Sequence, residues 1–268
     1  MQGTDNIHPS LNDASTVCIA SVMKSGTHWM RYLFANYQKL LTLDRIDDAG
    51  AVTYDQLQSI YSPTDRRLCI RQGQEAKSSR IYPMHGIKSV FWQHVDQNLA
   101  TYEGRIVFIY RNPLDYAVSR YFYDKARWEA EGRDVSSVGA TIAWSVEWYA
   151  RGIRVMFDMM KTNPRILPVT YEELKMAPVA VMGIVFRWAG FPHNPVKLRK
   201  AIELSDASNV RKEEETRQKP IVGPTSEGYF VRDSSVGQWR KHLSDDDVRR
   251  AAAILSRQGL RLENFITN

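Results

Sequence analysis

The chain has 268 residues, a length that favours one α/β domain with a large core over several small domains. Its hydrophobic share of 43% and charged share of 25% are typical of a globular protein, and no apolar run reaches the roughly 18 residues that a membrane helix needs. The formal charge of +6 favours an anionic partner, but the basic residues are spread along the chain and do not choose between a nucleic acid and a phosphorylated nucleotide.

The N-terminal segment, Met1 to Ser15, is polar and lacks the apolar core of a secretory signal, so a cytoplasmic location is expected. The first apolar run after it contains Cys18, and the only other cysteine is Cys69. Neither cysteine stands at a metal-ligand spacing, and thiols in the cytosol are normally reduced. We therefore expect two structural cysteines and no metal site.

Short apolar runs rich in β-branched residues alternate with helical patterns along the rest of the chain. Four runs predict buried strands: Thr16–Val22, Arg80–Met84, Arg105–Tyr110 and Arg165–Thr170. Six patterns predict helices: Trp29–Leu41, Asp115–Ala130, Val138–Lys161, Pro178–Ala189, Pro195–Leu204 and Asp245–Gln258. This alternation predicts an α/β fold, a single domain over residues 1–268 in which helices flank a central parallel sheet.

Two stretches lack sustained periodicity and are predicted as loops. Asp44 to Lys77 carries few strong signals and is expected to include short helices, whereas Lys212 to Gln238 is polar and contains prolines and glycines. Loops this long inside a compact domain are usually functional. Ligands of α/β folds bind beyond the carboxyl ends of the strands, so we expect these loops to border a ligand site.

The first predicted strand runs into the segment 23–29 (MKSGTHW), and a helix follows directly. A strand, a tight glycine-containing loop and a helix N-terminus form an anion cradle, because backbone N–H groups and the helix dipole attract negative charge. Lys24 adds a full positive charge, and Ser25, Thr27 and His28 add hydrogen-bond donors. The segment predicts a P-loop-like phosphate-binding loop, although an ordinary turn with a solvated lysine gives the same pattern.

This loop is not a Walker A motif. That motif reads G-x-x-x-x-G-K-[ST], with its lysine after the second glycine. Here Lys24 precedes Gly26, and no glycine stands four or five residues earlier. A kinase-like phosphotransferase therefore loses its main support. It would also need an acidic strand end for magnesium, and no aspartate or glutamate directly follows any of the apolar runs.

A second segment follows the predicted strand that ends at Tyr110. Asn112 suits the N-cap of the next helix, and Pro113 suits its first position. Ser119 stands seven residues after Asn112, about two helical turns on, and shares its face of the helix. Arg111 at the strand end and Ser119 on this face can bind one further phosphate through a guanidinium fork and a hydroxyl.

The two segments together resemble the cytosolic-type sulfotransferases that depend on 3′-phosphoadenosine 5′-phosphosulfate (PAPS). That family has a P-K-S-G-T-T-W loop for the 5′-phosphosulfate and an R-N-P-x-D-x-x-V-S segment for the 3′-phosphate. This chain reads M-K-S-G-T-H-W at 23–29 and R-N-P-L-D-Y-A-V-S at 111–119, in the same order. The resemblance implies a PAPS site that includes Lys24, Ser25, Gly26, Thr27, His28, Trp29, Arg111 and Ser119.

Further matches extend the resemblance over most of the chain. His85 ends a predicted strand where the family has K-T-H, and Tyr171 opens a segment like the family's Y-E-D. Residues 204–212 look like the adenine-side segment, which adds Ser205, and residues 230–239 resemble F-x-R-K-G-x-x-G-D-W, which adds Arg232. The family's fold is one α/β domain with a central parallel sheet, in agreement with the fold predicted from periodicity.

The chain departs from the family pattern at several positions. Pro83 replaces the lysine two residues before the predicted catalytic histidine and removes a charge from the transfer region. Lys88 is a candidate replacement for that charge, although a surface lysine gives the same sequence. Asp233 and Ser234 replace K-G after Arg232, which should weaken the grip on the 3′-phosphate. The other replacements are Met23 for proline, His28 for threonine and Ala207 for the aromatic residue beside adenine.

The resemblance also implies roles in sulfuryl transfer. His85 is the predicted general base, because an imidazole with a pKa near 6.5 can take the proton of an acceptor hydroxyl at neutral pH. Lys24 is expected to stabilise charge on the leaving phosphate, and Ser119 to position Lys24 or the 3′-phosphate. His94 is the rival base, but its apolar and aromatic neighbours in the sequence favour packing.

The predicted function is therefore transfer of a sulfuryl group from PAPS to a hydroxyl of a small-molecule or carbohydrate acceptor, with 3′,5′-ADP (PAP) as product and no metal. A basic nucleic-acid-binding module is the other alternative. Its basic and aromatic residues would cluster, whereas the aromatic residues here are typical of helix packing. We expect neither a nucleic-acid partner nor an integral membrane segment. The acceptor and the oligomeric state do not follow from the sequence.

Overall fold

The structure, a computed structural model, describes residues 13–60, 89–95, 97–133, 137–216 and 232–265. The predicted strand 80–84 lies outside these ranges. The chain divides into two compact units. Unit 1 comprises Met1–Tyr110 and Val155–Asn209, and unit 2 comprises Arg111–Arg154 and Val210–Asn268.

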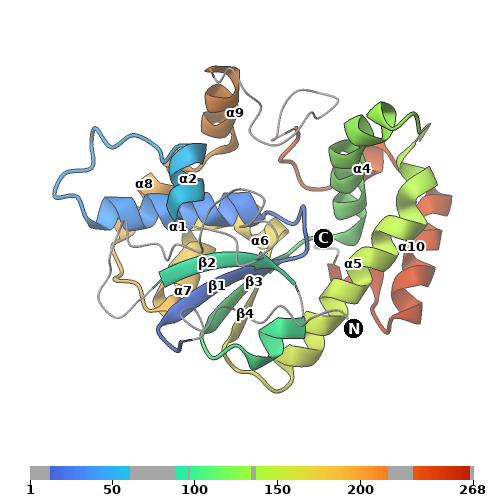
Figure 1. Cartoon of the computed structure of the whole chain (residues 1–268), viewed down its shortest axis with the longest axis horizontal. Coiled ribbons are helices and arrows are strands. Elements are labelled where there is room, and N and C mark those ends of the chain that lie inside the picture. Colours follow the sequence, from blue (N-terminus) through green and yellow to red (C-terminus); the bar gives the residue numbers. More distant parts are fainter. Residues whose placement is uncertain (1–12, 61–88, 96, 134–136, 217–231, 266–268) are drawn as a thin grey trace. The chain divides into compact units, whose positions relative to one another are not determined.

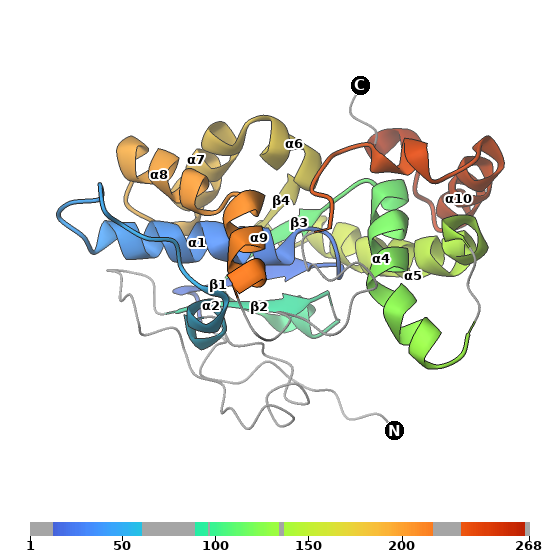
Figure 2. The ribbon, with the colours of Figure 1, turned by 90° about the horizontal axis from the view of Figure 1, so that it is seen from above.

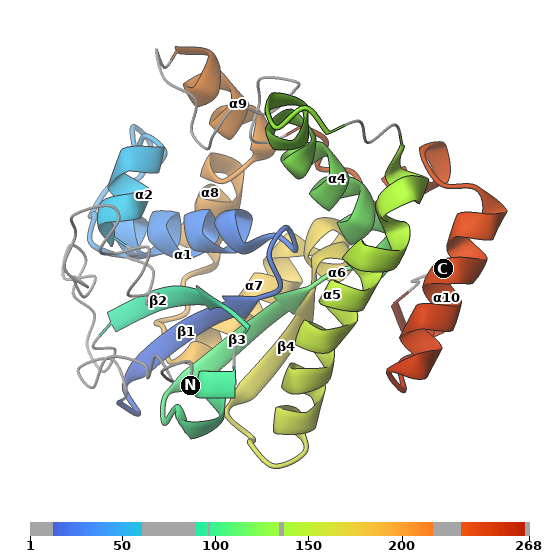
Figure 3. The ribbon, with the colours of Figure 1, turned by 45° about the vertical axis from the view of Figure 1, so that its right-hand side comes forward.

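A parallel sheet forms the centre of unit 1 (Figure 3). Its strands stand in the order β2 (Ser89–His94), β1 (Thr16–Ser21), β3 (Arg105–Tyr110) and β4 (Ile166–Thr170). Ser21 pairs in register with His94 on one side and with Ile109 on the other, so the carboxyl ends of three strands meet at one edge. The predicted α/β fold with a central parallel sheet is confirmed.

Strand β2 is the strand that sequence analysis missed. Its sequence is SVFWQH, in which Phe91 and Trp92 indicate only a packing role for the neighbouring His94. Val90 and Phe91 are buried, and the Phe91 ring meets the Tyr102 ring edge-on with centroids 5.4 Å apart. The apolar run is only three residues long, between serine and glutamine, and so falls below the length that marks a buried strand by periodicity alone.

The helices of unit 1 are α1 (Thr27–Leu41), α2 (Tyr54–Ile60), α6 (Tyr171–Met176), α7 (Pro178–Ala189) and α8 (Pro195–Leu204), with a short 3₁₀ helix η2 (Gln97–Thr101). In Figures 1 and 2, α1 runs along the sheet, and α8 packs against α1. Aromatic rings join α1 to α7: Phe186 meets Phe34 edge-on at 4.9 Å and stacks on Tyr37 at 4.2 Å. Helix α2 confirms the short helix expected within 44–77.

Helix α1 begins two residues earlier than predicted, at Thr27. Helix α6 was not predicted at all. It follows β4 without a loop because Thr170 and Glu173 form a capping box, in which each side chain accepts a hydrogen bond from the backbone N–H of the other residue. Tyr171 is therefore the first residue of a helix at the carboxyl end of β4.

Unit 2 is helical. It contains α4 (Pro113–Ala130), η3 (Gln238–Lys241), α10 (Asp245–Arg257) and η4 (Leu262–Phe265). Two further helices, α5 (Val138–Met160) and α9 (Ala207–Thr216), run on from one unit into the other. Helix α9 corrects the predicted loop 212–238, because residues 212–216 are helical; residues 217–231 lie outside the described ranges. Only Val210 of this helix is buried, and most of its other residues are polar or charged, so its sequence shows no apolar periodicity.

Helices α4 and α5 pack together through aromatic side chains and lie side by side in Figure 3. Tyr116 meets Tyr149 with centroids 4.7 Å apart, and Trp128 meets Trp144 edge-on at 6.3 Å. The predicted N-cap of α4 is confirmed, since Asn112 Oδ1 accepts a hydrogen bond from the Leu114 N–H at 2.8 Å. Tyr116, Tyr149 and Trp128 are thus packing residues, as expected, whereas Trp144 and Trp148 are 46% and 42% exposed.

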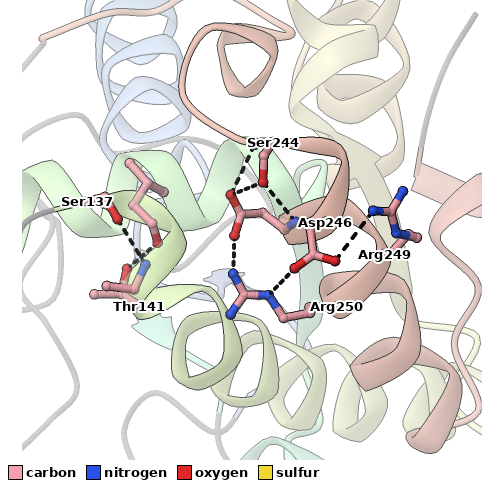
Figure 4. A network of polar contacts seen from close by, with 9 residues as sticks. Ser137, Thr141, Ser244, Asp246, Arg249 and Arg250 are labelled. Carbon is pink, nitrogen blue, oxygen red and sulfur yellow. Dashed lines mark hydrogen bonds and ion pairs between the residues drawn. The ribbon is translucent and has the colours of Figure 1, made fainter.

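Polar side chains fix the starts of α5 and α10 (Figure 4). Ser137 accepts a hydrogen bond from the Ala140 N–H at 3.2 Å. Ser244 opens α10 in a capping box with Asp247, and Arg250 forms ion pairs with Asp246 and Asp247. These caps supply the stop and start signals between elements of unit 2.

No helix in the described ranges is long and apolar enough to cross a membrane. Cys18 is completely buried in β1, and burial raises the pKa of its thiol far above the ordinary value. A thiol held neutral in the core behaves as a small apolar group, as the sequence predicted. Cys69 lies outside the described residues.

Candidate functional site

The segment between β1 and α1 turns through two residues in the left-handed backbone conformation. Lys24 has φ 69°, and Gly26, the N-cap residue of α1, has φ 102°. Within the described ranges Lys24 is the only non-glycine residue with a positive φ, a conformation that costs on the order of 1–3 kcal/mol. Such strain gathers at ligand sites, and left-handed residues turn successive N–H groups to one side, where they bind anions.

The N-terminus of α1 has no side-chain cap among the described residues. The first helical hydrogen bond runs from the Met30 N–H to Gly26 O at 3.0 Å, and the N–H of Ser25 turns back to Val22 O at 3.2 Å. The N–H groups of the first turn have no helical carbonyl four residues before them. Together with the positive end of the helix dipole, they give the geometry of an anion site.

Gly26 is required by space as well as by its dihedral angle. A Cβ atom at this position would stand 2.8 Å from Tyr171 Cδ2 and 3.0 Å from Ile109 Cδ1, closer than carbon atoms pack. The Tyr171 ring also meets the Trp29 ring edge-on with centroids 5.6 Å apart. Tyr171 therefore covers the loop, and three residues predicted for one site lie together.

The hydroxyls of the loop differ in their partners. Thr27 shares a hydrogen bond with the Ser21 hydroxyl at the end of β1. Ser25 is completely buried, and its hydroxyl has no hydrogen-bond partner among the described residues. Buried hydroxyls almost always have a hydrogen-bond partner, so the Ser25 hydroxyl is suited to bind a ligand oxygen. The cradle of N–H groups, Lys24 and Ser25 fits a phosphate or sulfate oxygen.

His28 belongs to an aromatic cluster beside this loop. Its ring stacks on Tyr54 of α2 with centroids 6.2 Å apart and is tilted against Trp92 of β2 at 6.4 Å. His94, at the end of β2, meets the same Trp92 ring edge-on at 5.3 Å. Two imidazoles therefore lie at the edge of the sheet where β1 and β2 end.

The surroundings of His28 keep its imidazole neutral. Burial is the main reason that its pKa falls well below 6.5, and the positive charges of Arg31 and Lys24 and the neighbouring His94 lower it further. Arg31 is itself buried, donates to Gln58 Oε1 at 3.0 Å and lies 4.8 Å over the Trp92 ring. A neutral His28 donates or accepts a hydrogen bond but adds no charge to the cradle.

In unit 2, Arg111 follows the last residue of β3 along the chain. Its side chain is buried, donates to Ser235 O at 3.3 Å and lies 3.7 Å from Asp115 Oδ2. Its carbonyl accepts a hydrogen bond from the Tyr149 hydroxyl of α5. Backbone and side chain of Arg111 are both fixed, which suits an arginine that recognises an anion with defined geometry.

Asp115 joins Arg111 to the segment before η3. Its completely buried carboxylate accepts hydrogen bonds from the N–H groups of Gly237 at 2.7 Å and Trp239 at 3.0 Å. A buried carboxylate with two N–H donors and a guanidinium nearby is fully compensated. Sequence analysis did not give this residue a site role.

Ser119 and Arg232 lie along the same face of α4. Ser119 stands one turn after Asp115 and one turn before Phe122, at the spacing that places side chains on one face. The Arg232 guanidinium lies 4.0 Å over the Phe122 ring and donates to Gln238 Oε1. Arg111 and Arg232 thus contact residues on the face of α4 that carries Ser119.

A family model of the sulfotransferase domain matches residues 14–261, a range that runs through both units. The chain belongs to the sulfotransferase domain family. The resemblance stated from two short motifs is therefore confirmed over nearly the whole chain.

Solved structures similar to this sulfotransferase share its fold. The mouse sulfotransferase SULT7A1 complexed with PAP has a TM-score of 0.63 and 19% identity, covering 93% of this chain and 86% of that one. Retinol dehydratase in complex with androsterone and inactive cofactor PAP has a TM-score of 0.59 and 14% identity, covering 93% and 82%. Its complex with retinol and PAP has a TM-score of 0.58. Among curated protein sequences, no match is found.

The remaining predicted residues have different outcomes in this sulfotransferase. Ser205 is buried; its hydroxyl donates to Ala201 O at 2.7 Å and accepts from Asn36 Nδ2 at 3.0 Å, so it ties α8 to α1. Its predicted contact with adenine stays a prediction. The predicted base His85 lies outside the described residues, together with Pro83 and Lys88.

Sequence analysis missed residues that hold the predicted ligand residues in place. Asp115, Phe122 and Gln238 contact the segments of Arg111 and Arg232, but none has a residue type that marks a phosphate site. Asp115 had one available signal, since it is part of the R-N-P-x-D pattern. Asp233, which replaces a family lysine, accepts a hydrogen bond from the Ser235 N–H at 2.8 Å. It therefore stabilises the turn whose Ser235 carbonyl accepts from Arg111.

Proposed function

We propose that this sulfotransferase transfers a sulfuryl group from PAPS to a hydroxyl of a small-molecule or carbohydrate acceptor. The observation that carries the proposal is the loop 23–29: a strained Lys24, an uncapped helix N-terminus and a buried Ser25 hydroxyl without a partner among the described residues. Backbone strain of this kind gathers at ligand sites, and a bound anion would give the helix N–H groups and the Ser25 hydroxyl a hydrogen-bond partner.

The predicted nucleotide contacts divide between two segments. The 5′-phosphosulfate would be held by the loop residues Lys24, Ser25, Gly26, Thr27, His28 and Trp29, with Tyr171 packed on Gly26. The 3′-phosphate would be held by Arg111, Ser119 and Arg232, and the adenine side by Ser205. PAPS, when bound, supplies the sulfuryl group and an anionic leaving group, PAP.

The chain's own residues supply charge and a proton acceptor. The Lys24 ammonium stabilises the negative charge that develops as the sulfur–oxygen bond to the phosphate breaks. His85 accepts the proton of the acceptor hydroxyl while the new oxygen–sulfur bond forms. His28 stays neutral, so it contributes a hydrogen bond and not a charge. The single-domain extent 1–268 and the cytoplasmic location remain predictions.

The acceptor proposal stays broad. Retinol dehydratase has been solved with androsterone and with retinol, which are small molecules with a hydroxyl group. The aromatic cluster of His28, Tyr54 and Trp92 beside the loop is compatible with such an acceptor. A screen with ³⁵S-labelled PAPS against phenols, sterols and sugars tests the class directly, and transfer to none of them would contradict a small-molecule or carbohydrate acceptor.

Calorimetry tests the co-substrate. We expect binding of 3′,5′-ADP in the micromolar range without magnesium, weaker binding of 5′-AMP and no comparable binding of ATP or an oligonucleotide. Preference for ATP with magnesium would support the kinase-like alternative, and preference for the oligonucleotide would support a nucleic-acid-binding module. Equal affinity for 3′,5′-ADP and 5′-AMP would contradict recognition of the 3′-phosphate.

A further inference from the structure

Arg232 is held from several directions within unit 2. The central carbon of its guanidinium stands 4.0 Å from the centroid of the Phe122 ring. One of its nitrogens, Nη2, donates a hydrogen bond to Gln238 Oε1. Its backbone carbonyl accepts a hydrogen bond from Arg211 Nη2 at 3.1 Å. A half-buried arginine with an aromatic platform, an amide partner and a backbone tether is fixed far more than a surface arginine.

Gln238 is fixed in its turn by Asp115. The residues on either side of it, Gly237 and Trp239, donate their backbone N–H groups to the Asp115 carboxylate. Gly237 allows this turn through its φ of 77°. The Gln238 side chain is almost completely buried. Its amide oxygen is therefore a rigid acceptor for Arg232.

Phe122 is anchored on the other side. It lies on α4 seven residues after Asp115, and so on the same helix face, and it packs against the buried cluster of Val118, Tyr121, Trp128 and Val138. The His242 ring meets its edge at 5.2 Å. The ring that supports Arg232 thus packs against the core of unit 2.

Stacking and amide bonding have complementary effects on a guanidinium. The ring covers a face of the planar group, which carries no donors, and the amide fixes its rotation in the plane. The in-plane donors keep the geometry that a phosphate needs. Ordering the arginine beforehand also removes part of the entropy cost of binding.

We propose that Phe122 and Gln238 are positioning residues that fix Arg232 for recognition of the 3′-phosphate, and that they set the preference for 3′,5′-bisphosphorylated adenosine over 5′-AMP. This inference rests on the proposed function.

The test compares the affinities for 3′,5′-ADP and 5′-AMP by calorimetry. Phe122→Leu keeps an apolar side chain without an aromatic face, and we expect it to weaken 3′,5′-ADP about tenfold and 5′-AMP hardly at all. Phe122→Tyr should restore the wild-type ratio. Gln238→Leu should reduce the ratio as well, and serves where Phe122→Leu fails to fold. Arg240→Ala removes an exposed arginine 4.6 Å over Trp239 and should leave the ratio unchanged.

A double-mutant cycle separates positioning from general destabilisation. In an Arg232→Ala background, Phe122→Leu should have no further effect on 3′,5′-ADP affinity, because the residue acts through Arg232. A second loss in that background, or equal losses for both nucleotides in the single variant, would overturn the inference. Wild-type protein that binds both nucleotides equally would instead contradict the proposed function, and the inference with it. If the wild type and Phe122→Leu both prefer 3′,5′-ADP over 5′-AMP by the same factor, the inference is contradicted and the proposed function is not.

Discussion

The two predicted anion sites are built in different ways. The loop 23–29 in unit 1 uses backbone: left-handed dihedral angles at Lys24 and Gly26 and an uncapped helix N-terminus. The segment at Arg111 in unit 2 uses side chains: a guanidinium that Asp115 and the Ser235 carbonyl hold in place. A backbone site depends on which residues can adopt its conformation. A side-chain site depends on neighbouring residues that hold the ligand-binding side chain in one conformation.

The largest effect is expected from a residue outside both anion sites. His85→Ala should lower the rate of transfer about 10²–10⁴-fold, the usual contribution of a general base, and leave 3′,5′-ADP affinity unchanged. Single-turnover measurements at a series of pH values give the rate of transfer. The wild-type rate should rise with pH through the range in which histidine titrates, and the rate of the variant should not. An unchanged pH profile in the variant would move the assignment to His94 or to an acceptor that ionises unaided.

Lys24 tests the chemistry of the backbone site. Lys24→Met keeps the length of the side chain and removes its charge, so turnover should fall about 10²–10³-fold while 3′,5′-ADP affinity changes far less. Lys24→Arg is the matched control and should retain part of the rate. If turnover and affinity fall by the same factor, Lys24 binds the ground state only.

Arg111 tests the side-chain site. Arg111→Ala removes a charge-assisted hydrogen bond of about 1.5–3 kcal/mol, which corresponds to a roughly ten- to hundredfold loss of 3′,5′-ADP affinity. Affinity for 5′-AMP should stay the same. Arg154→Ala, which removes an exposed arginine that donates to Gln258 O, is the control in the same unit. Parallel losses for both nucleotides would show that Arg111 only stabilises the fold.

Gly26 tests whether the loop depends on its backbone conformation. Gly26→Ala combines a positive φ with contacts of 2.8 and 3.0 Å, and should lower the free energy of unfolding by about 1–3 kcal/mol and weaken nucleotide binding. Gly132→Ala has a φ of 69° but nothing within 4 Å, and Gly50→Ala has neither constraint. Urea unfolding should show the largest loss of unfolding free energy for Gly26→Ala and the smallest for Gly50→Ala. Equal losses for Gly26→Ala and Gly132→Ala would show that the contact with Tyr171 does not contribute.

The smallest effect concerns pH and His28. Its pKa is lowered in the folded chain, so the unfolded chain binds the proton more readily and folding stability falls as pH drops below about 6.5. The groups that act on it are Arg31, Lys24 and His94. Between pH 7.5 and 5, the melting temperature measured by thermal unfolding should fall less for His28→Thr than for the wild type. An imidazole that titrates near 6.5 by NMR would contradict the assignment.

Local sequence was sufficient where an element carries its own signal. Asn112 and Pro113 predicted the start of α4, and the apolar runs at β1, β3 and β4 predicted three strands of the sheet. Two elements were missed for different reasons. Strand β2 depends on pairing with β1, which is distant in sequence, whereas the short helix α6 has a local capping box but is too short to show helical periodicity.

The same division applies to the candidate site. Two motifs, at 23–29 and 111–119, were enough to place the chain in its family, because residue type and order there are set by the chemistry of binding phosphate groups. The left-handed Lys24, the cover of Tyr171 over Gly26, the neutral His28 and the support of Arg232 by Phe122 and Gln238 required the tertiary structure. Most of these features involve residues far apart in sequence, up to 145 positions for Gly26 and Tyr171, and no local pattern records such contacts.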